Sequence, residues 1–174
     1  MSDTAQFLRQ PANRKQIWLA LGVGALVLAA DQGSKCWVVE GLRLRAVGAV
    51  DVVPPLLNFR MAWNTGVNFG LGGGNPELTR WPLVIFSFVV ASVALYWAGK
   101  MRTRVQAIGC GVAAGGAIGN AIDRLSWGAV ADFINMSCCG WTNPWSFNVA
   151  DIAIFVGFGM AVLLPLGPRK ATTS

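Results

Sequence analysis

Four long apolar segments, separated by short polar or charged stretches, dominate the hydropathy pattern of the chain. We place the first at residues 17–39, the second at 81–98, the third at 105–122 and the fourth at 147–167. Each is close to the ~20 apolar residues that a helix needs to cross the hydrocarbon core of a bilayer. The pattern predicts an all-α membrane protein, a bundle of four transmembrane helices forming a single domain over residues 1–174.

The segment between the first two spans, approximately residues 40–76, has a different pattern. Residues 57–63 alternate between large apolar side chains and polar or small ones, a period of two that is typical of a half-buried strand. Residues 50–53, just before two consecutive prolines, are suited to pair with this strand, and glycines at 70–74 give a flexible exit. We therefore expect a small β-sheet between the first two helices in sequence, resting on the outer (periplasmic) surface of the membrane that the helices span.

The composition agrees with a membrane location. Hydrophobic residues make up 54% of the chain and charged residues only 13%, whereas soluble domains have roughly 25% charged residues. The net charge is +6, and eight of the fourteen cations lie beside the spans, namely Arg9, Arg14, Lys15, Lys100, Arg102, Arg104, Arg169 and Lys170. By the positive-inside rule both termini are cytoplasmic. The cations form no basic surface, so we expect contact with membrane lipids and none with nucleic acid.

Some catalytic classes are excluded by composition. The chain has no histidine, which excludes Ser-His and Cys-His catalysis and histidine-based zinc sites. Its four cysteines lack the paired spacing of a zinc site. Cys110 is predicted to be a small buried hydrophobe, and the neighbours Cys138 and Cys139 are poorly placed to bridge each other. We expect no metal and no cofactor.

Acidic residues are the strongest functional signal. Four of the eight acids lie in or beside the apolar segments, namely Asp31, Asp123, Asp132 and Asp151. Acids at membrane depth are costly and by default indicate function. Two of them have ordinary explanations. Asp31 precedes Lys35 by four residues on one helical face and is able to pair with it. Asp123 is open to neutralisation by the adjacent Arg124 or by another cation.

Asp132 and Asp151 are harder to explain as structural ions, since neither has an adjacent cation. A hairpin from the third to the fourth span would bring them together near the outer surface. Two close carboxyls cannot both ionise easily, so the pair would offer one base and one acid. From spacing alone, such catalysis and an ion or proton pathway are equally open, and Asp123 competes for membership of the pair. A small proton-coupled transporter is therefore the alternative function.

Five sequence blocks, taken together, resemble the lipoprotein signal peptidase (signal peptidase II) family over nearly the whole chain. They are DQGSK at 31–35, NTGVNF at 64–69, GGAIGN with the following DR at 115–124, VADF at 130–133 and FNVAD at 147–151. The chain departs from the family at Asn68, where the family usually has alanine.

This resemblance implies an aspartic endopeptidase of the bacterial inner membrane, with its active site on the periplasmic side. It implies diacylglyceryl-modified prolipoproteins as substrates, cleaved before the modified cysteine, and inhibition by the depsipeptide globomycin. No obligate protein partner is evident.

Residue roles follow from the same resemblance. It makes Asp132 and Asp151 the catalytic pair, which moves Asp123 to a supporting role. Asp31 and Lys35 would brace the outer ends of the bundle and the sheet. The positions that match substrate-binding or dyad-supporting residues of the family are Asn64, Gly66, Asn120, Asp123, Arg124, Asn148 and Ala150.

Overall fold

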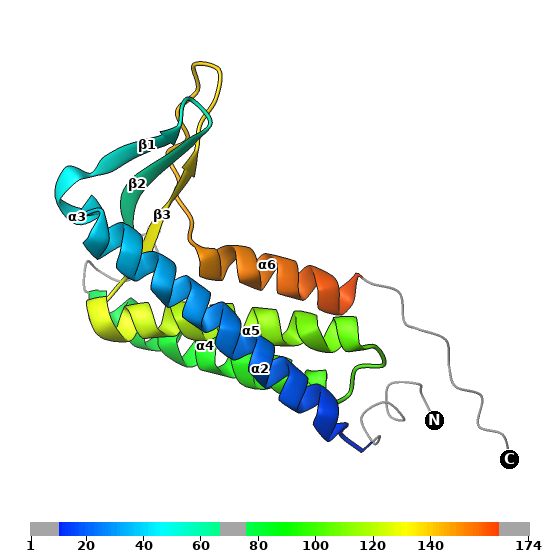
Figure 1. The fold of residues 1–174 in the computed structure, drawn as a ribbon. Helices are drawn as coiled ribbons and strands as arrows, with labels where there is room; N and C mark the ends of the chain where they lie inside the picture. Colours follow the sequence, from blue (N-terminus) through cyan, green and yellow to red (C-terminus); the bar gives the residue numbers. More distant parts are fainter. Residues whose placement is uncertain (1–10, 67–75, 164–174) are drawn as a thin grey trace, which may run out of the picture.

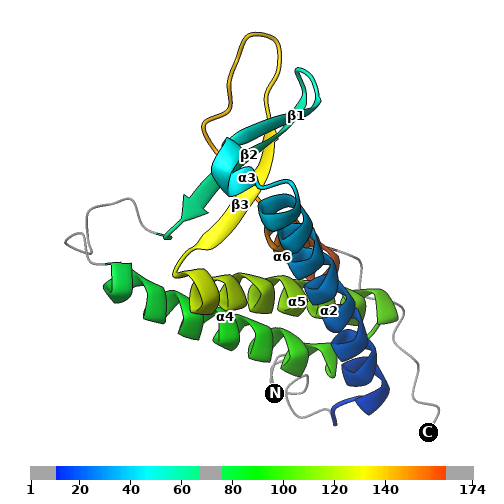
Figure 2. The ribbon, with the colours of Figure 1, turned by 60° about the vertical axis from the view of Figure 1, so that its left-hand side comes forward.

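The structure, a computed structural model, describes residues 11–66 and 76–163. Its helices form a bundle, and three strands form a sheet that projects sideways from one end of the bundle (Figures 1 and 2). The elements in chain order are α2 (Arg14–Lys35), the π-helix η1 (Cys36–Gly41), α3 (Leu44–Val47), β1 (Ala49–Val53), β2 (Leu57–Asn64), α4 (Pro76–Ala98), α5 (Arg104–Trp127), β3 (Val130–Met136) and α6 (Val149–Val162).

Three helical segments within the described residues are long and apolar enough to cross a membrane. They are Arg14–Gly41, Glu77–Ala98 and Arg104–Trp127. The last helix, α6, is apolar but has 14 residues. The end of the predicted fourth span, 164–167, lies outside the described residues. The mostly helical membrane fold is confirmed, and a fourth complete crossing stays a prediction.

Helix α5 lies at the centre of the bundle. In its most apolar window 72% of the residues are buried, compared with 17% for the first span and 22% for α4. Glycines allow this close packing: a β-carbon at Gly115 would lie 2.5 Å from the carbonyl oxygen of Gly24 on α2. Small residues at such contacts let helix backbones approach in lipid, where no hydrophobic effect drives helices together.

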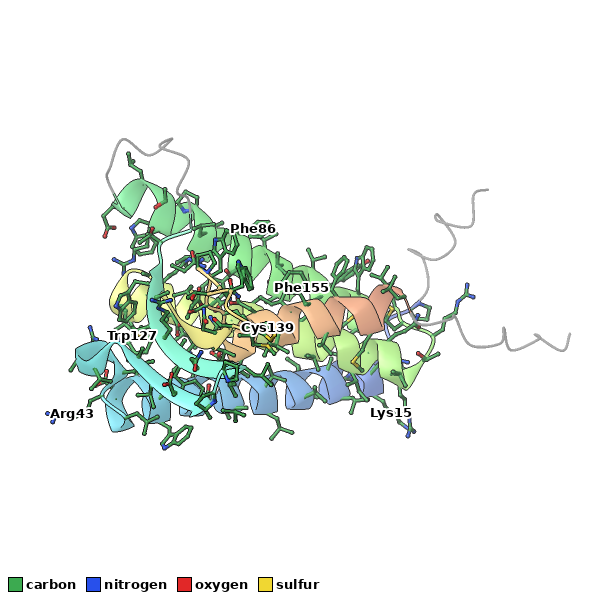
Figure 3. The ribbon with its side chains drawn as sticks, turned by 90° about the horizontal axis from the view of Figure 1, so that it is seen from above. Lys15, Arg43, Phe86, Trp127, Cys139 and Phe155 are labelled. Atoms are coloured by element: carbon green, nitrogen blue, oxygen red, sulfur yellow. A yellow bond between two sulfur atoms is a disulfide. The ribbon has the colours of Figure 1, made fainter. Side chains whose placement is uncertain are left out.

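Large apolar side chains point outward from the bundle. Phe86 on α4 and Phe155 on α6 are 63% and 81% exposed, and they lie between Lys15 and Arg43, which mark its two ends (Figure 3). An apolar exterior over a core of alanine and glycine is the arrangement that a bilayer favours, since lipid covers the exposed surface.

The sheet is antiparallel, with strand order β1-β2-β3. The predicted pairing of residues 50–53 with 57–63 is confirmed, with Val50 opposite Phe59. The expectation that the sheet is confined to residues 40–76 is wrong, because β3 joins it from beyond α5. The buried run of β3 lacks the period-two alternation that indicated β2. Phe133 of β3 packs edge-on against Phe59, with the ring centroids 5.6 Å apart.

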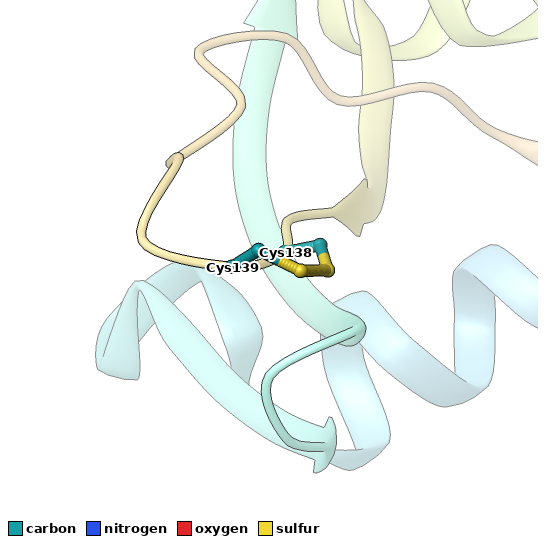
Figure 4. Close-up of a disulfide and its surroundings, with 2 residues drawn as sticks. All are labelled: Cys138 and Cys139. Atoms are coloured by element: carbon teal, nitrogen blue, oxygen red, sulfur yellow. A yellow bond between two sulfur atoms is a disulfide. The ribbon is translucent and has the colours of Figure 1, made fainter.

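Cys138 and Cys139 form a disulfide in the loop that follows β3 (Figure 4). The expectation that these neighbours are poorly placed to bridge is therefore wrong. Cys139 adopts a left-handed backbone conformation with φ of 58°, in a turn where the Trp141 amide donates to the Cys138 carbonyl at 2.9 Å. Sequence spacing gives no sign of that turn.

The glycine contacts predict a sharp difference between two alanine substitutions. A β-carbon at Gly109 would lie 2.7 Å from the Gly157 carbonyl oxygen and 2.8 Å from the Ala161 nitrogen. Both are backbone atoms of α6, so the helix must shift, and such overpacking costs roughly 1–3 kcal/mol. Gly109→Ala should lower the Tm in detergent.

The matched control is Gly159→Ala, because no atom lies within 4 Å of its added carbon. It should leave the Tm unchanged or raise it slightly, through the better helix propensity of alanine. A Gly109→Ala protein that melts at or above the wild-type temperature would contradict the α5–α6 packing.

Candidate functional site

A buried ionic cluster joins α2 to α5 at the end of the bundle that carries the sheet. The Lys35 ammonium lies 2.7 Å from Asp31 Oδ2 and 2.6 Å from Asp123 Oδ2, and all three side chains are essentially inaccessible. The expected Asp31–Lys35 pair therefore forms, and the cation bonded to Asp123 is Lys35. Gln32, which sequence reasoning did not single out, donates to both carboxylates at 3.0 Å. The only signal for Gln32 is its place in the DQGSK block.

The cluster also fixes the backbone of two other elements. Asp31 Oδ1 accepts from the Ala150 amide of α6 at 2.9 Å, and Asp123 Oδ2 accepts from the Ala131 amide of β3 at 3.2 Å. These alanines directly precede Asp151 and Asp132. A β-carbon at Gly119 would lie 2.5 Å from Asp31 Oδ2, so glycine leaves the room that the carboxylate occupies. The cluster thus sets the positions from which the two candidate catalytic acids project.

Amide side chains connect Asp132 to Asp151. Asn148 Nδ2 donates to Asp132 Oδ1 at 2.6 Å and lies 3.2 Å from Asn120 Oδ1. Asn120 Nδ2 in turn donates to Asp151 Oδ1 at 2.8 Å. From β2, Asn64 donates to Asp132 Oδ2 at 3.0 Å. Three of the expected supporting residues therefore contact the expected acids directly.

The first turn of α6 holds Asp151 by a capping box. Asn148 is the N-cap, and its Oδ1 accepts from the Asp151 amide at 2.9 Å. Asp151 Oδ2 accepts in return from the Asn148 amide at 3.3 Å. This reciprocal pattern is a strong helix start, and it sets a carboxylate at the positive end of the helix dipole. Asn148 thereby fixes both acids, one through its side chain and the other through the cap.

Arg124 contributes positive charge close to the candidate acids. It interacts electrostatically with Asp151, Asp123 and Asp132, and its Nη1 donates to the Asn120 carbonyl at 3.2 Å. Its buried Nε has no hydrogen-bond partner among the described residues. Gly66, which we expected beside the substrate, lies two residues after the end of β2. Its backbone has a φ of 95°, and its amide donates to Asn64 Oδ1 at 2.9 Å. Asn68 lies outside the described residues.

The electrostatics of Asp132 suit a carboxyl that keeps its proton. Burial, followed by the negative charge of Asp151, raises the pKa of Asp132 from 3.8 to about 6. Hydrogen bonds from Asn64 and Asn148 and the charge of Lys35 act in the opposite direction but do not outweigh burial. Asp132 is only 3% exposed. In mildly acidic solution this site therefore offers a protonated carboxyl near a second carboxyl.

Asp132 opens into a cavity of about 270 Å³. Its walls come from the end of β2 and from the loop before α6, and they include Trp63, Asn64, Gly66, Trp145 and Ser146. Sequence reasoning missed the wall residues of the loop, because an irregular segment carries no periodic signal. No group of three or more His, Cys, Asp or Glu side chains within 11–66 and 76–163 is arranged to hold a metal ion.

The ionic cluster predicts how charge removal affects stability. Lys35→Met leaves two buried carboxylates without their ammonium, and breaking a buried ion pair in this way costs roughly 3–5 kcal/mol. We expect a large fall in Tm in detergent. Adding Asp31→Asn and Asp123→Asn to Lys35→Met should recover much of the loss, because neutral groups need no counter-ion.

The exposed Lys15→Met is the control and should melt like the wild type. Equal melting temperatures for Lys35→Met and Lys15→Met would refute the structural importance of the cluster.

Comparison with known proteins places this site in context. A sequence model of signal peptidase II matches residues 23–166. The lipoprotein signal peptidase of Nitrobacter hamburgensis is 40% identical over 145 residues, covering 80% of this chain and 87% of the relative. That of Caulobacter vibrioides is 37% identical over 150 residues, covering 86% and 87%. That of Rhodopseudomonas palustris strain TIE-1 is 37% identical over 142 residues, covering 80% and 86%.

Two solved structures, both of bacterial membrane enzymes obtained by the in meso method, have the same fold. One gives a TM-score of 0.69 at 23% identity, covering 83% of this chain and 90% of the other. The second gives 0.66 at 24% identity, covering 83% and 85%.

Proposed function

The chain belongs to the signal peptidase II family, and we propose that it removes the signal peptide of prolipoproteins by cutting before a diacylglyceryl-modified cysteine. Its relatives carry the name lipoprotein signal peptidase, which supports this substrate class. We further propose that the reaction is of the aspartic type, without metal or covalent intermediate, and that globomycin inhibits it.

The observation that carries this proposal is the amide network that connects Asp132, which lines the 270 Å³ cavity, to Asp151. Two carboxyls held in unequal environments supply an acid and a base at once. Asp132 is the more buried, and its raised pKa makes it the member that carries the proton before reaction. Asp151 is then the carboxylate that accepts a proton.

The chemistry requires only these two groups and water. Asp151 takes a proton from water as the water oxygen attacks the scissile carbonyl, and Asp132 gives its proton to the carbonyl oxygen. The tetrahedral intermediate collapses as the carbon–nitrogen bond breaks, and the nitrogen takes the proton held by Asp151. Asp132 regains a proton from the intermediate's hydroxyl, which restores the singly protonated pair. General acid–base catalysis of this kind contributes about 10²–10⁴ in rate for each group.

Supporting roles follow from the contacts. Asn64, Asn120 and Asn148 hold the two carboxyls in place, and Arg124 balances their charge. Ala150 is fully buried, so its role is to keep α6 close to α5 rather than to touch substrate. The buried ion pairs among Asp31, Lys35 and Asp123 stabilise the helices that carry the site.

We place the protein in the bacterial inner membrane as a multi-pass protein, with both termini cytoplasmic and the active site periplasmic. The cations beside the spans support this orientation. A proton-coupled transporter, the alternative from sequence, has less support. Asp31, Asp123, Asp132 and Asp151 gather at one end of the bundle, whereas transporter sites lie near the membrane midplane.

Neutralising either proposed catalytic acid provides the direct test. Asp132→Asn and Asp151→Asn should each lower cleavage of a lipidated prolipoprotein by at least ~10²-fold, while the protein stays folded in detergent. Glu40→Gln, the equivalent change at an exposed acid of η1 that lines neither the cavity of Asp132 nor the larger hollow on the sheet, should cleave normally. Near-normal turnover by folded Asp132→Asn would refute the assignment.

The raised pKa of Asp132 predicts the pH dependence. The active form needs protonated Asp132, so kcat/KM, which reports the free enzyme, should fall as pH rises through about 6. It should also fall at low pH, where the base that activates water is lost. Asn64 stabilises ionised Asp132, so Asn64→Leu should move the alkaline limb to higher pH. Profiles of kcat/KM in detergent test this, and a profile that rises steadily above pH ~6 would contradict the proton assignment.

A further inference from the structure

A second and larger hollow lies on the sheet beyond the cavity of Asp132. Its volume is about 490 Å³, within the ~300–1,000 Å³ typical of ligand sites. Residues of all three strands line it, among them Asp51, Asn58, Arg60 and Asn135, and the loop after β3 closes one side with Trp141. The proposed reaction leaves this hollow without a role.

The two hollows form a row. Along β2, Asn58 and Arg60 line the larger hollow, while Ala62 and Asn64 line the cavity of Asp132. These positions alternate along β2, across the shift in the β2–β3 register between Phe59 and Ala62, and they line the same side of the sheet. Along the loop, the lining likewise passes from residues 140–142 to residues 144–146. Ser146, which lines the smaller hollow, donates its hydroxyl at 3.0 Å to the carbonyl of Arg60, which lines the larger one.

The loop wall is fixed by a buried asparagine that the reaction itself does not use. Asn135 is 1% exposed, and its Nδ2 donates to the carbonyls of Asn143 and Trp145 at 2.9 Å each. Ser137 donates to Asn135 Oδ1 at 2.8 Å and accepts from the Asn143 amide at 3.1 Å. The groove is therefore already shaped before anything binds, which lowers the entropy cost of binding an extended chain.

Arg60 gives this groove a charge preference. Its side chain is exposed, and it has no ion pair within the described part of the chain. The one carboxylate among the lining residues, Asp51, lies opposite Asn58, and a 180° flip of the Asn58 side-chain amide lets its nitrogen donate to Asp51 Oδ1 at 2.9 Å. The guanidinium thus remains available to an incoming anion.

We propose that this second hollow receives the first residues of the mature chain, just after the cleaved bond, and that Arg60 selects an acidic side chain there. The proposal rests on the peptidase function proposed above. The signal peptide is apolar and belongs with the helices, so the polar chain that follows it leaves along the sheet, the side on which the groove continues.

The register of the strands determines which residue of the substrate lies beside Arg60. Asp132 lies opposite Ala62, and Arg60 is two residues further along β2. Two strand residues span about 7 Å, and an extended substrate rises by about the same amount over two residues. Arg60 should therefore meet the second or third residue after the cleaved bond.

The test uses three lipidated prolipoprotein peptides that carry Asp, Asn or Lys at these two positions. With the wild-type protein we expect kcat/KM to be roughly twofold to fivefold higher for Asp than for Lys, mainly through KM, the size expected for an exposed charge pair. Arg60→Glu should reverse this order, and Arg60→Gln should remove it. The preference should shrink at high salt, because ions screen exposed charges.

Arg43→Glu is the matched control, since Arg43 is exposed at the same end of the molecule but does not line the groove. It should keep the wild-type order. The same Asp-to-Lys ratio in wild type, Arg60→Gln and Arg60→Glu would overturn the inference while leaving the peptidase function intact. If the wild-type protein cleaves none of the three peptides, the proposed function itself fails, and this inference with it.

Discussion

One buried ammonium group, that of Lys35, positions most of what surrounds the candidate active site. It forms ion pairs with Asp31 and Asp123, and removing one partner of a buried ion pair strongly destabilises a protein. Each carboxylate also accepts a backbone amide, from Ala150 and from Ala131. Since these alanines directly precede Asp151 and Asp132, the ionic cluster sets the separation of the two acids through the backbone. The geometry of the candidate site thus depends on an interaction that involves neither of the two proposed catalytic acids.

The four acids near this site divide into two kinds by their partners. Asp31 and Asp123 each form an ion pair with the Lys35 ammonium, so their role is to hold the fold together. Asp132 and Asp151 are held by the amides of asparagines instead. A neutral amide fixes the position of a carboxyl with a much smaller effect on its proton affinity than a cation has. The choice of asparagine rather than lysine therefore lets Asp132 keep a pKa near 6 in a rigid position.

Features set by neighbouring residues were predictable from sequence, and features set by distant contacts were not. The β1–β2 pairing and the Asp31–Lys35 pair follow from periods of two and of four residues. The β2–β3 pairing joins Asn64 to a residue 68 positions away, and no local pattern encodes it. The choice of Asp132 over Asp123 came from the family resemblance, because spacing alone could not tell which acid Lys35 neutralises. The Cys138–Cys139 disulfide lies in a turn where Cys139 adopts a left-handed backbone conformation, and the sequence pattern did not predict that turn.

The unpredicted strand changes how the sheet should be understood. Asp132 belongs to β3 and Asp151 to α6, so one proposed catalytic acid comes from the sheet and the other from the bundle. Any tilt of the sheet relative to the helices would move the two carboxyls apart, and catalysis tolerates misplacement of only a fraction of an ångström to about 1 Å. Asn148, the ionic cluster and the Phe59–Phe133 contact all oppose that tilt. The sheet therefore supplies half of the proposed active site, and the same sheet carries the larger hollow proposed to receive the substrate.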